Sequence, residues 1–115
     1  MHPRISINTL CFAPEPLDRL IEQVARIGAR GISPDLEQVL EFGIAKAAHL
    51  LGGAALEVAT LTHRAFSFAT PELAASGRDQ LNHTIEVAAT IGAQSITMTT
   101  GGRGALRWPD AVERF

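Results

Sequence analysis

The stretch IGAQSITMTTGGRG, residues 91–104, decides the fold class. It has the pattern of an apolar helix end, a glycine stop, a short β-branched strand and a glycine-rich exit. The segments IGARGI at 27–32 and LGGAALEV at 51–58 repeat the first three of these features. Strands that are separated by whole helices cannot pair as hairpins, so the repeats predict right-handed βαβ crossovers and a parallel sheet.

Working outward from these junctions, the sequence predicts four strands, near 5–12, 31–33, 55–62 and 94–100. Helices are expected from Pro16 to Gly28, from the Ser33-Pro34 cap to Gly52, and from the Thr70-Pro71 cap to Gly92, with a further helix starting at Pro109.

The length of 115 residues allows at most one modest domain, here residues 1–115. An eight-stranded βα barrel needs about 250 residues, so four units correspond to half of one. The sequence therefore predicts an α/β fold that forms the first four units of a TIM barrel, with the first and fourth strands as open parallel edges. A small flavodoxin-like open sheet is the alternative.

The bulk composition predicts a globular protein, because 46% of the residues are hydrophobic and 19% are charged. No apolar run is long enough to cross a bilayer and the first residues lack a secretory pattern, which predicts a cytoplasmic protein. A net charge of −2 and a pI near 6.0 indicate no general attraction to nucleic acid or membrane. The single cysteine, Cys11, excludes an intrachain disulfide framework and a Cys-rich zinc site.

The glycine-rich exit does not fit either common phosphate-binding loop. Arg107 stands where the third glycine of G-x-G-x-x-G should follow Gly102 and Gly104. A P-loop needs Lys and Ser/Thr after its last glycine, but Ala105 and Leu106 follow here. What remains is a strand end that leads into a turn, at the end of a parallel sheet where ligands bind, or else a plain loop.

A histidine is predicted at a strand's carboxyl end in LTHRAF, residues 61–66. His63 could bind a metal or a sugar hydroxyl, move a proton, or simply pack beneath the loop. Arg64 and Arg103 are expected on the same rim, where they could clamp a phosphate or carboxylate or be ordinary surface residues. Asp35 and Glu37 follow the second strand, but stabilisation of a helix N-terminus explains them equally well.

Two aromatic residues complete the candidate pocket. Phe12, at the end of the first predicted strand, is expected to be a pocket wall, and Trp108 either stacks on a sugar ring or caps the last helix. No complete catalytic set is readable: tight metal sites need three or four protein ligands, and no Ser-His-Asp arrangement can be recognised.

The run ISINTLCF, GARGISPDL, LEVATLTHRAF and IGAQSITMTTGGRG resembles the N-terminal half of the xylose isomerase-like TIM barrels. That sugar phosphate isomerase/epimerase superfamily also contains endonuclease-IV-type nucleases. The resemblance implies a divalent metal, Mn²⁺, Mg²⁺, Co²⁺ or Zn²⁺, held by Glu, Asp, His and Glu at the ends of later strands. Two glutamates there would act as acid and base beside a carbonyl. None of these ligands or glutamates can be assigned to this chain.

What the resemblance does imply for this chain is a set of pocket roles. His63 matches the strand-three histidine, a substrate contact in many members and a metal ligand in the nuclease branch. Met98, Thr99 and Thr100 stand where that branch has a second histidine, which counts against nuclease chemistry. Thr100 and Gly101 are expected beside a small sugar or polyol, with or without a phosphate.

Three functions follow from these observations. The first is the N-terminal part of a metal-dependent sugar (phosphate) isomerase or epimerase, inactive alone and free of nucleic-acid and membrane partners. The second is a half-barrel binding or assembly module that pairs its open sheet edges with another copy or a partner chain. The third is a nuclease relative, which the pI and the strand-four threonines disfavour.

Overall fold

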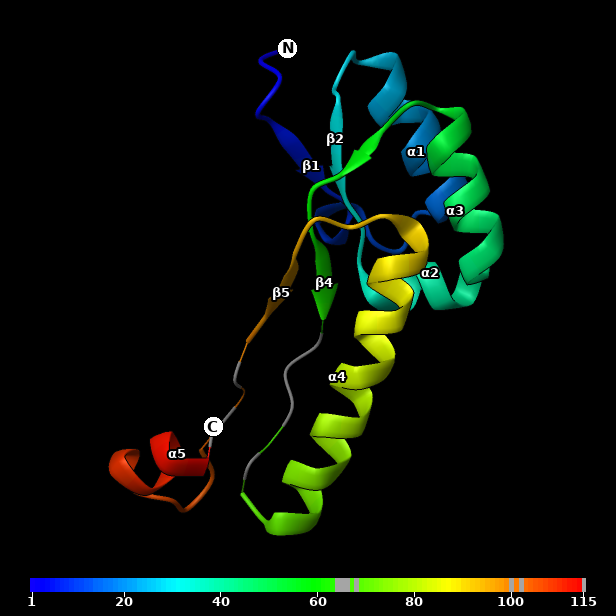
Figure 1. The fold of residues 1–115 in the computed structure, drawn as a ribbon. Helices are drawn as coiled ribbons and strands as arrows, with labels where there is room; N and C mark the ends of the chain where they lie inside the picture. Colours follow the sequence, from blue (N-terminus) through cyan, green and yellow to red (C-terminus); the bar gives the residue numbers. More distant parts are fainter. Residues whose placement is uncertain (64–66, 68, 100, 102, 115) are drawn as a thin grey trace.

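The computed structural model describes residues 1–63, 67, 69–99, 101 and 103–114 (Figure 1). Along the chain its elements are β1 (Ser6–Asn8), the 3₁₀ helix η1 (Thr9–Phe12), α1 (Leu17–Arg26), β2 (Gly31–Ser33), α2 (Leu36–Phe42), α3 (Ile44–Gly53), β3 (Glu57–Val58), β4 (Leu61–His63), α4 (Pro71–Ile91), β5 (Ile96–Met98) and α5 (Trp108–Arg114). No helix in these ranges is long and apolar enough to span a membrane.

The strands are parallel, which confirms the predicted βα repeat. β2 pairs with β1 on one side and β3 on the other, and β4 pairs with β5. A parallel bridge between Asp35 and Thr62 joins the two sheets. Helices α1 to α4 all lie on one side of the strands (Figure 1). A flavodoxin-like sheet carries helices on both faces, so the partial barrel is the correct alternative.

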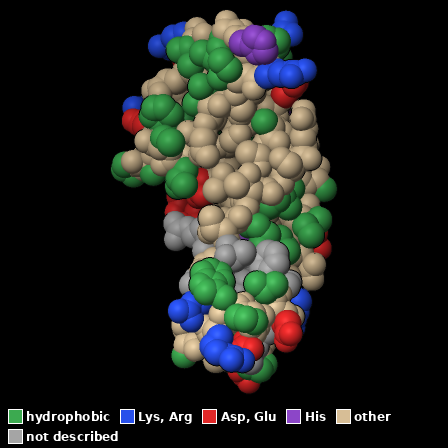
Figure 2. All heavy atoms as spheres, turned by 90° about the vertical axis from the view of Figure 1, so that its left-hand side faces the viewer, with side chains coloured by type: hydrophobic (Ala, Val, Ile, Leu, Met, Phe, Trp, Pro, Cys, Tyr) green, Lys and Arg blue, Asp and Glu red, His purple; other side chains and the backbone are tan. Residues whose placement is uncertain are grey.

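The sheet is apolar on the helix side and polar on the other. Ile32, Val58 and Leu61 are buried in one core with the helices. On the opposite face, Ser6 Oγ lies 2.6 Å from Ser33 Oγ. Residues alternate between the faces of a strand, so burying one face leaves the other to polar groups. Figure 2 shows this open face, the centre of which is mainly backbone and uncharged polar side chains.

The first strand is shorter than the predicted 5–12. The Asn8 side chain accepts a hydrogen bond from the backbone N–H of Leu10 and caps a 3₁₀ helix at Thr9–Phe12. Phe12 therefore lies in this helix and not at a strand end. An Asn side chain that bonds the backbone two residues on offers an alternative to the strand ladder, which explains the early end.

The third predicted strand, 55–62, divides into β3 and β4 at a bulge. Ile32 pairs with Val58, but Asp35 pairs with Thr62, so the third strand gains one residue between the two pairs. An extra residue changes which face the following side chains take. It is this shift that leaves both Val58 and Leu61 in the core. The fourth strand is also shorter than predicted, at Ile96–Met98.

The second predicted helix is two helices, with a break at Gly43. This residue has φ of 100°, which favours glycine, and it ends α2 and precedes α3. The cap of α2 is Asp35 and not the expected Ser33, because the Asp35 carboxylate accepts from the Glu37 N–H at 3.1 Å. The predicted Thr70 cap of α4 is confirmed by its hydrogen bond from the Leu73 N–H at 3.3 Å.

The close approach of β1 and β2 predicts the effect of Gly31→Ala. A Cβ at this position lies 3.1 Å from both the Ile5 carbonyl oxygen and Ser6 Cβ, so β1 must move. We expect the free energy of unfolding to fall by about 1–3 kcal/mol, as for other overpacked positions. Urea unfolding followed by far-UV circular dichroism measures it.

Gly52→Ala is the matched control. Gly52 lies in α3 and a Cβ there meets nothing within 4 Å. Alanine should raise the free energy of unfolding by about 0.5–1 kcal/mol, because glycine loses more backbone entropy in a helix. Equal effects of the two substitutions would contradict the contact at Gly31.

Candidate functional site

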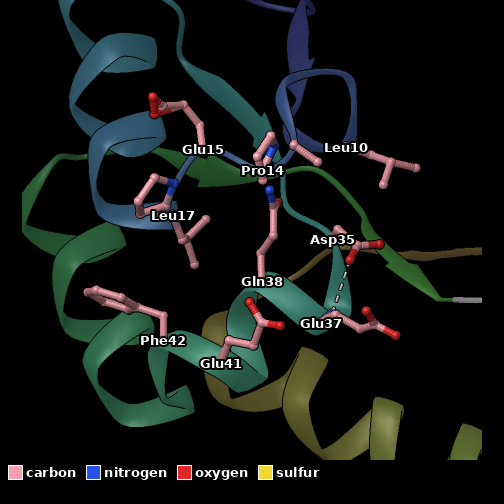
Figure 3. A pocket seen from close by; sticks show the side chains of 11 residues that line it. Leu10, Pro14, Glu15, Leu17, Asp35, Glu37, Gln38, Glu41 and Phe42 are labelled. Carbon is pink, nitrogen blue, oxygen red and sulfur yellow. Dashed lines mark hydrogen bonds between the residues drawn. The ribbon is translucent and has the colours of Figure 1, made fainter.

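A cavity of about 410 Å³ lies at the carboxyl ends of β1 and β2, between the segment after β1 and helix α2 (Figure 3). Its lining comprises Leu10, Ala13, Pro14, Glu15, Pro16, Leu17, Asp35, Glu37, Gln38, Glu41 and Phe42. Leu17 and Phe42 form one wall and Asp35 lies across from them (Figure 3). The carboxyl ends of parallel strands are where α/β barrels bind ligands, so this is the candidate site.

Buried polar groups hold the two sides of the cavity together. Thr9, fully buried after β1, donates its hydroxyl hydrogen to Gln38 Oε1 on α2. The same hydroxyl oxygen accepts the Asp35 N–H at 3.1 Å. Asp35 is only 3% exposed and caps α2 through its carboxylate. One threonine therefore fixes the 3₁₀ helix against the start of α2.

The cavity is rich in acceptors and negatively charged. Four carboxylates line it, from Glu15, Asp35, Glu37 and Glu41, and the residues of its lining that the structure describes include no Lys, Arg or His. Carboxylate oxygens accept hydrogen bonds from hydroxyl groups and repel phosphate or other anions. Within the described parts of the chain, no group of three or more His, Cys, Asp or Glu residues is arranged to hold a metal ion. The cavity therefore suits a neutral hydroxylated ligand.

His63 is the last residue of β4 and lies between that strand and α4. It is 4% exposed, and its Nδ1 lies 2.7 Å from Thr84 Oγ1. The Thr84 hydroxyl donates its hydrogen to the Gln80 carbonyl at 2.9 Å, so its oxygen accepts from an Nδ1–H group. Burial lowers the pKa of His63. These contacts assign the ring proton to Nδ1, and the lowered pKa favours the neutral imidazole at this buried position.

The glycine-rich exit forms a second group with its own contacts. Arg103 donates to the Leu106 carbonyl and lies over the Trp108 ring at 5.7 Å from its centre. Gly101 is exposed with φ of 68°. A Cβ on Gly104 would lie 3.1 Å from Ala69 Cβ, so the segments after β4 and β5 are neighbours.

The residues predicted as one pocket fall into different places. Phe12 is 52% exposed in η1 and does not line the cavity, whereas Leu10 and Ala13 beside it do. Trp108 is the first residue of α5 and Arg103 lies over its ring, and Figure 1 shows α5 apart from α2. Arg64 and Thr100 lie outside the described residues.

Glu15, Gln38 and Glu41 are cavity residues that sequence reasoning missed. Glu15 belongs to the turn APEP directly after β1 and η1, and Glu41 lies one helical turn beyond Glu37. Their positions just after the first two strands were a readable signal. The 3₁₀ helix at Thr9–Phe12, which makes these two segments face each other, had no such signal in the sequence.

Comparison with known proteins shows which structures share this arrangement of strands and helices. No family model and no curated protein matches the sequence. Among solved structures, protein SMc04130 from Sinorhizobium meliloti 1021 is similar, with 26% identity, a TM-score of 0.79, and coverage of 96% of this chain and 41% of that one. An AP endonuclease, family 2, from Brucella melitensis has 17% identity, a TM-score of 0.81, and coverage of 98% and 46%.

A third solved structure names the architecture. It is a fusion protein described as a xylose isomerase-like TIM barrel with 4-hydroxyphenylpyruvate dioxygenase, at 14% identity and a TM-score of 0.70, covering 81% of this chain and 15% of that one. The chain folds as part of a TIM barrel, the architecture that the description of this fusion protein names. This partial barrel spans less than half the length of each of the three proteins.

Removing the hydroxyl that faces His63 tests the buried pair. Thr84→Val should lower the free energy of unfolding by about 1–3 kcal/mol, since the imidazole N–H loses this acceptor. Thr84→Ser keeps a hydroxyl and should lower the free energy of unfolding by less. Nitrogen-15 NMR should report the Nδ1-protonated tautomer in the partial barrel, and an Nε2-protonated ring would contradict the assignment.

The lowered pKa of His63 predicts a loss of stability in acid. His63 binds a proton near the ordinary histidine pKa of 6.5 in the unfolded chain, but only at lower pH in the native chain. The stability that the buried neutral ring contributes is therefore complete above pH 6.5 and is lost as the pH falls below it. Urea midpoints at pH 7.5 and 5.5 measure this. His63→Gln should show a smaller decrease than the parent chain, because the group whose pKa is lowered has been removed.

Proposed function

We propose that this partial barrel is the first four βα units of a sugar or polyol isomerase or epimerase. The observation that carries the proposal is the acceptor-rich cavity at the carboxyl ends of β1 and β2. In this role the chain binds and orients a small hydroxylated substrate. Proton transfer next to the substrate carbonyl then depends on groups contributed by the remainder of the barrel.

The lining supports a neutral polyol or keto-sugar over a phosphorylated one. Glu15 and Glu41 offer acceptors to hydroxyl hydrogens, while Leu17 and Phe42 offer apolar surface to the C–H side of a sugar. The nearby negative charge disfavours a phosphate. It also disfavours the phosphodiester backbone that a nuclease must bind, so isomerase chemistry is the better fit.

The metal of such a barrel is not assigned to this chain. The carboxylates of the cavity are not arranged as a metal site among the described residues, and Asp35 already caps α2. A divalent metal, if the complete barrel holds one, takes its ligands from outside the part described here. The 115-residue chain by itself is therefore expected to lack isomerase activity.

Ligand titration followed by NMR tests the binding role. Neutral ketoses and polyols are added to the ¹⁵N-labelled chain, with the corresponding sugar phosphates as a second series. Amide shifts should concentrate on residues 9–17 and 35–42 around the cavity and be larger for the neutral series. Shifts confined to the amino ends of the strands, near Arg4 and Arg30, would contradict the proposal.

Glu41→Gln and Glu22→Gln form a matched pair for that titration. Glu41 lines the cavity, whereas Glu22 lies on exposed α1 and pairs with Arg26. Losing one carboxylate of the cavity should weaken neutral-sugar binding at least about tenfold, in line with a hydrogen bond to a charged group, and Glu22→Gln should leave it unchanged. Turnover of ketoses by the chain alone, abolished by a chelator, would contradict the assignment of the metal ligands.

A further inference from the structure

A second cavity, here called the α3 groove, lies along the exposed side of helix α3 and shares only Phe42 with the candidate site. It has a volume of about 440 Å³ and is lined by Phe42, Ala45, Lys46, His49 and Leu50. We infer that the α3 groove binds a small apolar carboxylate, such as the anion of a medium-chain fatty acid.

The α3 groove is formed by one face of α3 and the last residue of α2. Four of its lining residues lie in α3, at spacings of three and four that place them on neighbouring turns of one helix face. Ala47 and Leu51 of the same helix are buried in the core, so the groove occupies the side of α3 that core packing leaves free. Phe42 joins this face from the end of α2, because the chain turns at Gly43.

The walls of the α3 groove are apolar. Phe42 and Leu50 are half-buried and pack against the hydrophobic core, so both are held in place while part of each side chain stays in contact with water. Ala45 is exposed, and its small side chain leaves room for a ligand. Covering such apolar surface with an alkyl chain removes it from water, which is favourable. A ligand of the groove therefore has an apolar body.

The polar side chains of the α3 groove favour an anionic head group. The described residues of its lining include Lys46 and His49 and no carboxylate. A Cβ on Gly43 would lie 3.7 Å from Lys46 Cδ, so the lysine stem follows the chain toward the start of α3. The first turn of α3 has no acidic residue, and the positive end of a helix favours negative charge. A carboxylate can accept hydrogen bonds from the ammonium group and from an imidazole N–H.

The size of the α3 groove favours a small molecule over a protein partner. Stable protein–protein interfaces use about 20–30 residues on each side, whereas five residues line this groove. Its volume is within the range of about 300–1,000 Å³ that is typical of small-ligand sites. Helix α3 contacts both α1 and α4, so the units on either side of it in the sequence are present in this chain.

The α3 groove and the candidate cavity select ligands of different charge. Four carboxylates line the cavity and repel an anion, whereas Lys46 attracts one. Phe42 lines both sites and forms a wall of the cavity with Leu17 (Figure 3). A carboxylate in the groove therefore packs against a residue that borders the sugar site, without occupying that site.

Titration of the ¹⁵N-labelled chain with octanoate tests the groove, with octanamide as a neutral probe of the same length. Octanoate should shift the amides of residues 42–50 and bind about two- to fivefold more tightly than octanamide, in line with an exposed ion pair. Equal affinity of the two probes, or shifts that centre on residues 9–17 of the candidate cavity, would overturn the inference. Shifts at 42–50 that depend on protein concentration without octanoate would also overturn it, because a second copy would then cover the groove.

Lys46→Gln and Lys46→Arg separate the charge of the lysine from its packing. Glutamine removes the charge, so octanoate binding should weaken about two- to fivefold and octanamide binding should stay the same. Arginine keeps the charge and should bind octanoate within about twofold of the parent chain. Unchanged octanoate binding by Lys46→Gln would contradict the role of the lysine.

Ala45→Glu and Ala75→Glu form a second matched pair. Both replace an exposed alanine in the first half of a helix, but only Ala45 lines the α3 groove. A carboxylate within the groove repels octanoate, so Ala45→Glu should weaken its binding at least about tenfold, while Ala75→Glu should leave it unchanged. Far-UV circular dichroism checks that both variants keep their helices, and equal weakening by the two would contradict the location of the site.

These measurements are independent of the proposed function, because they need no sugar. If octanoate fails to bind at residues 42–50, the inference fails and the sugar site stands. If neutral sugars fail to bind at the candidate cavity while the Lys46 and Ala45 variants behave as expected, the proposed function fails and the α3 groove stands.

Discussion

Burial of one face of the parallel strands beneath α1 to α4 is the constraint on which the rest of this structure depends. Ile32, Val58 and Leu61 contribute their side chains to that single core. Because strand residues alternate, the opposite face is left to Ser, Thr and Gly positions. Because the paired strands are parallel, their carboxyl ends gather on one rim. Both the open face and the candidate site follow from this arrangement.

A small network of polar side chains fixes the two sides of the cavity relative to each other. Thr9 joins the end of β1 to Asp35 and Gln38, so the start of α2 is positioned by a residue from another unit. A buried hydroxyl with both a donor and an acceptor partner is stable, whereas one without partners is costly. The cavity is therefore held by groups that have their own structural role, leaving Glu15 and Glu41 to face a ligand.

The rim is divided into two groups of residues. The segments after β1 and β2 enclose the carboxylate-lined cavity, while those after β4 and β5 bring Ala69 beside Gly104 and Arg103 over Trp108. His63 lies beneath the second group, bonded to α4. In a closed barrel both groups border one opening, so a substrate at the first would have the second as its neighbour. The partial barrel displays these two groups without the strands that would complete the ring.

The sequence by itself determined the parallel βα order, the Thr70 cap of α4 and the position of His63 at a strand end. These depend on local patterns: apolar spacing, capping side chains and glycine stops act within a few residues. Tertiary structure alone decided the early end of β1, the bulge between β3 and β4, the Asp35 cap and the pairing of His63 with Thr84. Each of those needs a partner more than twenty residues away or a choice between competing local bonds, and only the packed chain brings such partners within hydrogen-bonding distance.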